Sequence, residues 1–251
     1  MKRATGIGGV FFKSKNVPAI KDWYRDNLGF QTTDWGATFV WGEASSDKIC
    51  RTEWSPFKDD STYYAPSTMP FMINYLVHDI RTLIETLKNE DVQVVGGVDE
   101  FDYGKFAWIM DPEGRKIELY EPADAGFGDS PPVWTDRVTG LGGVFFKSED
   151  PKAMKEWYRK HLGITDSFIW KDLVTKKEGL TAWAPMDEKD QFFAESNKPF
   201  LFNYRVRDLD GLLASLRKSG VRISDTITEA PYGRFGWAID PDGTKLALWQ
   251  P

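Results

Sequence analysis

Apolar positions along this chain follow first a strand-like and then a helix-like spacing, and the whole succession occurs twice. Residues 8–13 form a short run rich in glycine, valine and phenylalanine, which predicts a strand. After a turn, apolar residues recur three or four positions apart up to Gly29, which predicts an amphipathic helix that ends at a glycine. The helix stripe is Ile20, Trp23, Tyr24 and Leu28, and its second copy is Met154, Trp157, Tyr158 and Leu162. The same packing face is therefore used twice.

Alignment of the chain with itself identifies a sequence duplication. The first block is identical at 15 of 24 positions at a constant offset of 134 residues. A second block runs from a strand into a helix, and a third closes each copy with 10 identities in 20 positions, both at an offset of 129. The paired blocks are residues 6–29 and 140–163, 70–79 and 199–208, and 103–122 and 232–251.

Turn and cap residues predict how these elements connect. Asp79 and Asp208 each precede an apolar stripe and are expected to be helix N-caps. The DPEG and DPDG sequences of the third block predict a hairpin of two antiparallel strands. Between the first and second blocks, residues 38–41 and 49–54 are strand-like, and residues 58–67 are expected to be an exposed loop. This interval is five residues shorter in the second copy, so differences in binding are expected to begin there.

The order of elements predicts the fold class and the domains. Each half reads strand, helix and further strands, followed by a second strand, a helix and three strands. We therefore expect an α+β protein built from four βαβββ modules, two in each half. The predicted domains are residues 1–125 and 139–251. The Gly-, Pro-, Ser- and Asp-rich stretch between them, residues 126–138, is expected to be a linker.

Composition narrows the classes of partner. Of 251 residues, 41% are hydrophobic and 28% charged, and no apolar run approaches the ~18 residues that a membrane span needs. A net charge of −6 with scattered Lys and Arg offers no footprint for nucleic acid. The single cysteine, Cys50, can form neither an internal disulfide nor a metal-binding cluster. Because the N-terminus carries no secretory-type apolar segment, we expect a cytoplasmic protein that binds neither nucleic acid nor membrane.

The element order and motifs resemble one known superfamily. GVFF before the WYRDNLG helix, a strand that runs into a capped helix, and a closing DPEG hairpin that ends in IELYEP are similar to the vicinal oxygen chelate superfamily. This is the group of glyoxalase I, extradiol dioxygenases and bleomycin-resistance proteins. The resemblance covers nearly the whole chain, once in each half. It implies two glyoxalase/bleomycin-resistance-like domains, in which paired modules curl mixed sheets into cups that hold ligands.

Most of the metal ligands that this resemblance implies are replaced. Metal-dependent members commonly carry a His on the first strand, a His on the strand before the second helix and a Glu on the closing strand. In that order this chain has Gly9, Met72 and Glu118 in its first half and Gly143, Leu201 and Ala247 in its second. One carboxylate cannot supply the three protein ligands of a usual catalytic site. We therefore expect no metal site of the family type and no cofactor.

The two histidines and the glycine pair have plain structural interpretations. His78 lies near a helix start and His161 near a helix end, so both are expected to face solvent. Glycine at position 9 either opens room for a bulkier ligand or permits a close approach of packed strands. Because the pair Gly8 and Gly9 recurs in the second half, packing is the favoured explanation.

Polar residues on the expected cup face are candidates for ligand contact. Period-two alternation places Asn74 on the face that the resemblance assigns to the cup. Asn74 and its copy Asn203 either satisfy neighbouring backbone groups or bind and orient a ligand. Glu118 is the candidate catalytic residue. It either pairs with Lys116 or another basic residue, which is the favoured interpretation, or acts as a general base whose pKa is raised.

Four further residues are candidate ligand contacts near the closing hairpins. Lys105 and Arg234 occupy equivalent positions at the expected cup rim. A cation there can anchor an anionic ligand, although protection of a sheet edge is slightly favoured. Trp108 and Trp237 are expected to pack in a core first and to line a cup second.

These observations favour a metal-free protein of the bleomycin-resistance type that binds or sequesters a small apolar or anionic molecule in an aromatic cup. The alternative is an enzyme similar to lactoylglutathione lyase or a dioxygenase that uses Glu118 with unconventional partners. A third hypothesis is a scaffold for protein interactions. Single-domain members usually pair as dimers, and a tandem chain can pair internally through a pseudo-two-fold axis, so a monomer is expected.

Overall fold

The computed structural model describes residues 3–46, 48–123 and 137–251. The first half contains β1 (Ala4–Ser14), α1 (Val17–Leu28), β2 (Ala37–Glu43), β3 (Ile49–Lys58), the 3-10 turn η1 (Thr62–Tyr64), β4 (Phe71–Val77), α2 (Ile80–Asn89), β5 (Val94–Phe101), β6 (Gly104–Met110) and β7 (Lys116–Pro122). The second half contains β8 (Val138–Ser148), α3 (Pro151–Leu162), β9 (Ser167–Lys171), β10 (Glu178–Asp187), η2 (Gln191–Phe193), β11 (Phe200–Val206), α4 (Leu209–Lys218), β12 (Thr228–Ala230), β13 (Gly233–Ile239) and β14 (Lys245–Gln250).

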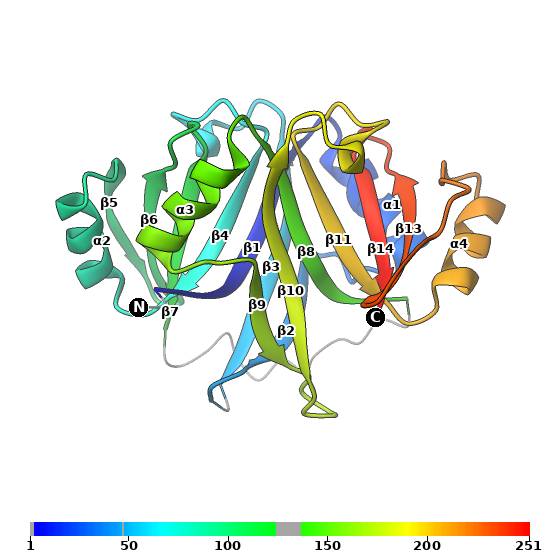
Figure 1. The fold of residues 1–251 in the computed structure, drawn as a ribbon, viewed down its shortest axis with the longest axis horizontal. Helices are drawn as coiled ribbons and strands as arrows, with labels where there is room; N and C mark the ends of the chain where they lie inside the picture. The colour runs from blue at the N-terminus through cyan, green and yellow to red at the C-terminus, as the bar shows by residue number, and fades with distance from the viewer. Residues whose placement is uncertain (1–2, 47, 124–136) are drawn as a thin grey trace.

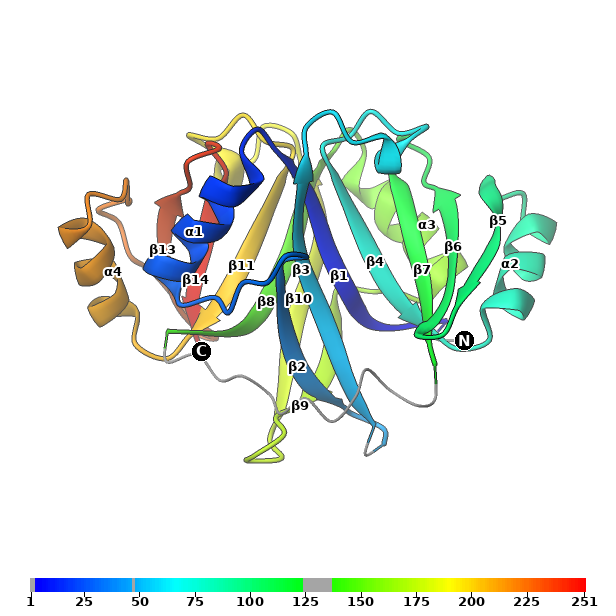
Figure 2. The same ribbon diagram turned by 180° about the vertical axis from the view of Figure 1, so that it is seen from behind.

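The strands form one strongly curved sheet, which confirms the α+β class. Its order is β12-β13-β14-β11-β8-β10-β9-β2-β3-β1-β4-β7-β6-β5, so each half occupies one side. Figures 1 and 2 show the two halves curling away from a central column of strands. At the junction β2 pairs antiparallel with β9. The first module of each half has two strands after its helix, and a 3-10 turn follows where a third strand was expected.

The expected caps and turns are present, while most of the expected linker cannot be checked. Asp79 accepts a hydrogen bond from the backbone of Thr82, and Asp208 accepts one from Gly211, as N-caps do. The closing hairpins are antiparallel, β6 with β7 and β13 with β14. Of the expected linker 126–138, residues 126–136 lie outside the described residues, and β8 begins at Val138. Within the described parts of the chain, no helix combines the length and the apolar character needed to cross a bilayer.

The two faces of the sheet carry different cores. On β4, Phe71, Ile73 and Tyr75 belong to the main core, which also holds the apolar stripes of all four helices. The alternate residues point to the opposite, concave face, where Met72 and Leu76 join separate small clusters. This concave face is the predicted cup, and the four α-helices of the described residues pack on the other face.

The two halves exchange helices on the main-core face. Figure 1 shows α3 beside β4, β6 and β7 of the first half, and Figure 2 shows α1 beside β11, β13 and β14 of the second. Buried aromatic pairs join the halves in the same reciprocal way. Trp54 donates its indole N–H to the Tyr204 hydroxyl at 2.9 Å, and Trp183 donates to Tyr75 at 2.6 Å. The two halves thus pair with each other inside one chain, which is the arrangement from which a monomer is predicted.

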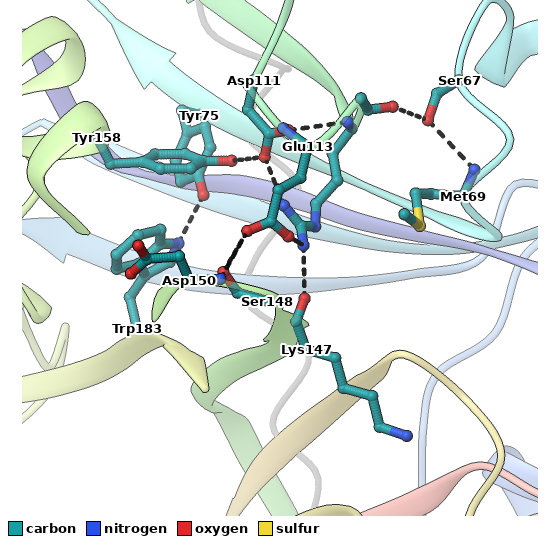
Figure 3. A network of polar contacts seen from close by, with 12 residues as sticks. Ser67, Met69, Tyr75, Asp111, Glu113, Lys147, Ser148, Asp150, Tyr158 and Trp183 are labelled. Atoms are coloured by element: carbon teal, nitrogen blue, oxygen red, sulfur yellow. Dashed lines mark hydrogen bonds and ion pairs between the residues drawn. The ribbon is translucent and has the colours of Figure 1, made fainter. Parts of the chain in front are cut away.

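One end of the interface between the halves is held by a buried ion pair (Figure 3). Arg115 donates to the carboxylate of Asp111 at 3.0 Å, and Tyr158 from α3 donates to the same carboxylate at 3.2 Å. The guanidinium also donates to the Lys147 backbone carbonyl of β8 at 2.5 Å. Both charged residues are only 4% exposed, and Arg115 also pairs with Glu113, so two carboxylates neutralise this buried guanidinium.

The opposite end repeats this arrangement without the cation. Asp240 takes the place of Asp111, and Tyr24 from α1 donates to it at 3.1 Å. Thr244 stands where the first half has Arg115. Burial, together with the nearby charge of Asp242, raises the pKa of Asp240 from 3.8 to about 6, although hydrogen bonds from Thr244 and Tyr24 partly offset this.

We expect the substitution Asp240→Asn to stabilise the protein above pH 6. A carboxyl with a raised folded-state pKa contributes its full stability below its unfolded pKa of 3.8, and this contribution is lost as the pH rises towards about 6. A shift of about two units corresponds to about 3 kcal/mol of unfolding free energy at neutral pH. In urea denaturation between pH 4.5 and 8, the unfolding free energy of the variant should increase relative to that of the parent protein as the pH rises.

Asp111→Asn is the matched control, because it removes one of the two carboxylates, Asp111 and Glu113, that neutralise the buried Arg115, and it should destabilise the protein at neutral pH. A constant difference between Asp240→Asn and the parent across this pH range would contradict the interpretation.

Candidate functional site

Four neighbouring strands bring one residue each to the same level of the first cup. In register, Gly9 of β1 lies opposite Asn74 of β4, which lies opposite Glu118 of β7, which lies opposite Trp108 of β6. The equivalent row of the second half is Gly143, Asn203, Ala247 and Trp237. The two rows differ in side-chain type only at the glutamate.

Glu118 is buried in this row and accepts hydrogen bonds from three uncharged donors. Asn74 Nδ2 donates to Oε1 at 2.6 Å, and Trp108 Nε1 donates to Oε2 at 2.8 Å. The hydroxyl of Tyr63 also donates to Oε2. With 2% exposure, burial raises the pKa of Glu118 above its usual value, while the three donors favour its charged form and limit the shift.

Lys116 is not the direct partner that was expected for Glu118. Its ammonium donates to the backbone carbonyl of Tyr63 at 2.8 Å and lies over the rings of Tyr63 and Trp108. Burial lowers the pKa of Lys116, and the nearby charge of Glu118 partly offsets this. The lysine therefore binds Tyr63 directly, and it influences Glu118 only through the electrostatic attraction between the two charges.

Sequence reasoning missed Tyr63, because residues 58–67 were expected to form an exposed loop. The loop instead folds over the cup through η1, and Tyr64 is 1% exposed. Tyr63 remains 37% exposed and stacks on Phe57 with ring centroids 5.4 Å apart. The sequence does contain an indication of this role. When the offset of 129 is extended back from Pro70, Tyr63 aligns with Phe192, so both copies carry an aromatic residue here.

In the second cup both members of the hydrogen-bonded pair Tyr63 and Glu118 are replaced by apolar residues. Phe192 replaces Tyr63 and Ala247 replaces Glu118. Phe192 packs against Trp237 at 4.8 Å, and Lys245 lies 4.5 Å above the same indole. The second cup is thus an apolar counterpart of the first.

The two cup asparagines share an unusual feature. Oδ1 of Asn74 and Oδ1 of Asn203 are both buried and have no hydrogen-bond partner. The Asn74 amide therefore donates to the Glu118 carboxylate. Neither Oδ1 accepts a hydrogen bond from a neighbouring backbone group, which is the role that a purely structural asparagine would have. A Cβ at Gly8 would stand 2.2 Å from Oδ1 of Asn74, so a larger residue there would displace this amide.

The residues at the expected metal positions do not fit a metal ion. The ring of Phe11 covers Gly9, with Cζ 2.6 Å from where a Cβ would stand, so this glycine permits packing and opens no room. Met72 packs with Phe11 in the same cluster. Both oxygens of Glu118 face N–H or O–H donors, which is the surrounding of a bare carboxylate. Among the described residues, no three His, Cys, Asp or Glu side chains converge as metal ligands.

Lys105 and Arg234 are held by local acids. Lys105 donates to Glu121 at 2.7 Å, and Arg234 donates to Asp210 at 2.8 Å. The favoured edge-strand interpretation was wrong, because β5 lies outside β6 and β12 lies outside β13.

Trp108 and Trp237 pack in the cup-face clusters and not in the main core, where core packing had been favoured.

The two histidines differ in exposure. His161 was expected to face solvent, and this prediction is wrong, because the residue is 4% exposed. Its Nδ1 lies 2.8 Å from Glu90, which also binds Arg3. His78 is exposed as expected.

The fold is similar to that of solved structures of a glyoxalase and of dioxygenases. The Mn(II)-bound glyoxalase from Novosphingobium aromaticivorans matches 100% of this chain and 83% of its own with a TM-score of 0.63 and 15% identity. The 2,2',3-trihydroxybiphenyl 1,2-dioxygenase from Sphingomonas wittichii strain RW1 matches 99% and 91% with a TM-score of 0.63 and 14% identity. The 2,3-dioxygenase LapB from Pseudomonas sp. KL28 matches 100% and 93% with a TM-score of 0.62 and 14% identity.

No protein-family model and no curated protein sequence matches the chain. The identities to the solved structures are low, so these similarities concern the fold and leave the reaction open. They do extend over the whole chain and both halves. The resemblance inferred from the GVFF, WYR and DPEG motifs is therefore confirmed at the level of the fold, which this chain shares with these glyoxalase and dioxygenase structures.

Proposed function

We propose that the first cup binds a small molecule without a metal ion and that the Glu118 carboxylate is its anchor. The observation that carries this proposal is the set of donors around Glu118. Two of them, Asn74 and Trp108, come from strands, whereas the third comes from the partly exposed Tyr63. A ligand that offers its own N–H or O–H can replace the Tyr63 hydroxyl and leave the carboxylate fully hydrogen-bonded.

The chemistry of the cup supports a ligand with an apolar or aromatic body and one polar donor. Phe11, Phe57 and Trp108 pack in one apolar cluster on the cup face, and the indole of Trp108 donates to the carboxylate. Apolar surroundings with few converging polar groups suit small-molecule recognition. An anionic ligand has weaker support in this cup, because Glu118 would repel it and Lys105 is already paired with Glu121.

A second candidate function is metal-independent proton transfer. The raised pKa of Glu118 brings this carboxylate nearer to the range of a general base, and the Tyr63 hydroxyl touches the same oxygen. The named neighbours, a glyoxalase and two dioxygenases, add weight to enzymatic chemistry. Turnover separates the candidates: a bound compound that exchanges a carbon-bound proton with deuterated water, and fails to do so in Glu118→Gln, would identify an enzyme.

We expect the protein to retain no metal. After incubation with manganese, iron, nickel or zinc salts and exhaustive dialysis, elemental analysis should find far less than one ion per chain, because Gly9 and Met72 supply no donors beside Glu118. Stoichiometric metal that disappears in Glu118→Ala would overturn the metal-free proposal.

We expect small aromatic amines, amides and phenols to raise the melting temperature, and donor-free analogues of the same shape to have less effect. Binding at one hundred times Kd stabilises by about 2.7 kcal/mol. Glu118→Ala, which copies Ala247 of the second cup, should weaken binding at least tenfold in calorimetry.

Asp210→Asn, remote in the other half, is the control variant and should bind normally. Equal affinity for donor-bearing and donor-free compounds, or binding that survives Glu118→Ala, would refute Glu118 as the anchor.

Tyr63→Phe should raise the pKa of Glu118 further, since the variant removes a donor that favours the carboxylate. Carbon-13 NMR of glutamate carboxyls, assigned with Glu118→Gln, measures this shift. Tyr64→Phe is matched in kind, because the Tyr64 hydroxyl is buried without a partner. It should leave the titration of Glu118 nearly unchanged and slightly stabilise the fold. An identical midpoint in Tyr63→Phe and the parent would show that the tyrosine does not hold the carboxylate.

A further inference from the structure

A second carboxylate of the first cup lies at the same level as Glu118. On β3, Glu53 pairs in register with Gly9 of β1. Gly9 in turn lies opposite Asn74, which lies opposite Glu118. Residues paired in this way project from the same face of a sheet, so Glu53 belongs to the cup face. The next residue, Trp54, lies in the main core, as the alternation along a strand requires. The first cup therefore holds two acids, one on β3 and one on β7.

Glu53 is held in place and still reaches the surface. The side-chain hydroxyl of Thr38 on β2 donates to its Oε2 at 2.7 Å. Burial raises the pKa of Glu53 above its usual value, while the hydrogen bond from Thr38 and the charge of Arg51 partly offset this. The residue is half-buried, in contrast to the 2% exposure of Glu118, so a ligand can reach it without displacing a neighbour.

Tyr120 lies close to both acids. It follows Glu118 by two residues on β7, hence on the same face, and it packs in a cup-face cluster. Burial is the largest cause that raises the pKa of its hydroxyl, and the charges of Glu53 and Glu118 raise this pKa further. The two carboxylates therefore border one and the same part of the concave face.

The stretch of sheet between the two acids is apolar. Gly9 stands between them in the row, and the ring of Phe11 covers it. Because β1 and β4 separate β3 from β7, three strand spacings of about 4.8 Å, roughly 14 Å in all, lie between the two backbones. The sheet curves around this face, so the carboxylates lie nearer to each other than the backbones do. One benzene ring with donors at its 1 and 4 positions, and a hydrogen bond of about 2.8 Å at each end, suits such a span.

The second half lacks this acid as it lacks the other. Ala182 of β10 occupies the position of Glu53, since each pairs in register with the glycine that begins the row of its half. Ala247 occupies the position of Glu118 in the same way. Two acids on strands that are not neighbours are thus both replaced by alanine. Their joint presence in one cup and joint absence from the other point to a single role that needs both.

We propose that Glu53 is a second anchor of the first cup, whose ligand is a neutral aromatic molecule with a hydrogen-bond donor at each end. One donor binds Glu118 and the other binds Glu53. Each carboxylate already has a cation near it, Lys116 for Glu118 and Arg51 for Glu53, so O–H or amide N–H groups meet the requirement better than a positively charged ligand does. The role of Glu53 rests on the proposed function of Glu118 and narrows the class of ligand.

Calorimetry with 4-hydroxybenzamide, which has a donor at each end, tests the second anchor in the full chain. We expect this compound to bind at least tenfold more tightly than phenol, whose single donor is expected at Glu118. Its isomer 3-hydroxybenzamide, with the same groups at a different angle, should bind less tightly. Glu53→Ala, which copies Ala182, should abolish the tenfold advantage and leave the affinity for phenol unchanged. Glu53→Gln keeps the shape and one acceptor, so it should reduce the advantage only in part.

Glu156→Ala removes an exposed acid of α3 that pairs with Arg159, and this control variant should bind every compound as the parent protein does. An equal loss for phenol and 4-hydroxybenzamide in Glu53→Ala, or no loss for either, would overturn the second anchor and leave Glu118 as the anchor. Phenol binding that is unchanged in Glu118→Ala would instead refute the proposed function. Absence of binding by all of these compounds at millimolar concentrations would overturn both.

Discussion

Each half of this protein buries tryptophan and tyrosine side chains whose polar ends are satisfied only by the other half. Trp54 needs the hydroxyl of Tyr204, and Trp183 needs that of Tyr75. A separated half would therefore expose a large apolar face and leave these N–H groups without their partners. This reciprocal requirement fixes the main-core face of the sheet in both copies. It leaves the concave face, which contributes less to the contact between the halves, free to change.

The changes on that concave face follow a chemical pattern. The first cup keeps a buried acid, Glu118, together with the tyrosine that serves it, and the second cup replaces both with Ala247 and Phe192. Near the junction the second half carries the additional charge, because Arg205 stands at the position of Leu76 and lies over the ring of Trp170. A buried charge requires hydrogen-bond partners of the opposite kind around it, so the buried acid and the hydroxyl that donates to it are absent together from the second cup. The two copies therefore differ in charge on one scaffold.

The sequence was sufficient for the fold because the repeat displays every element twice. Helix caps, hairpin turns and the alternation around Asn74 depend on neighbours in the chain, and these predictions are confirmed. The failures concern partners that are distant in sequence. His161 meets Glu90 and Arg3 only because β1 and α3 come together across the halves. Tyr63 was taken for a loop residue because its contact with Glu118, 55 positions away, leaves no local periodicity.

The carboxylate itself explains why the fold alone does not name the reaction. In a metal enzyme a glutamate at this level of the cup would need at least two further ligands on nearby strands, and at the positions expected for them β1 provides Gly9 and β4 provides Met72. Glu118 persists nonetheless, with 2% exposure and a pKa raised by burial, although an alanine is accommodated at the same place in the second half. A buried charge where the second half has a methyl group costs desolvation free energy, and the proposed role of Glu118 as a ligand anchor would account for it.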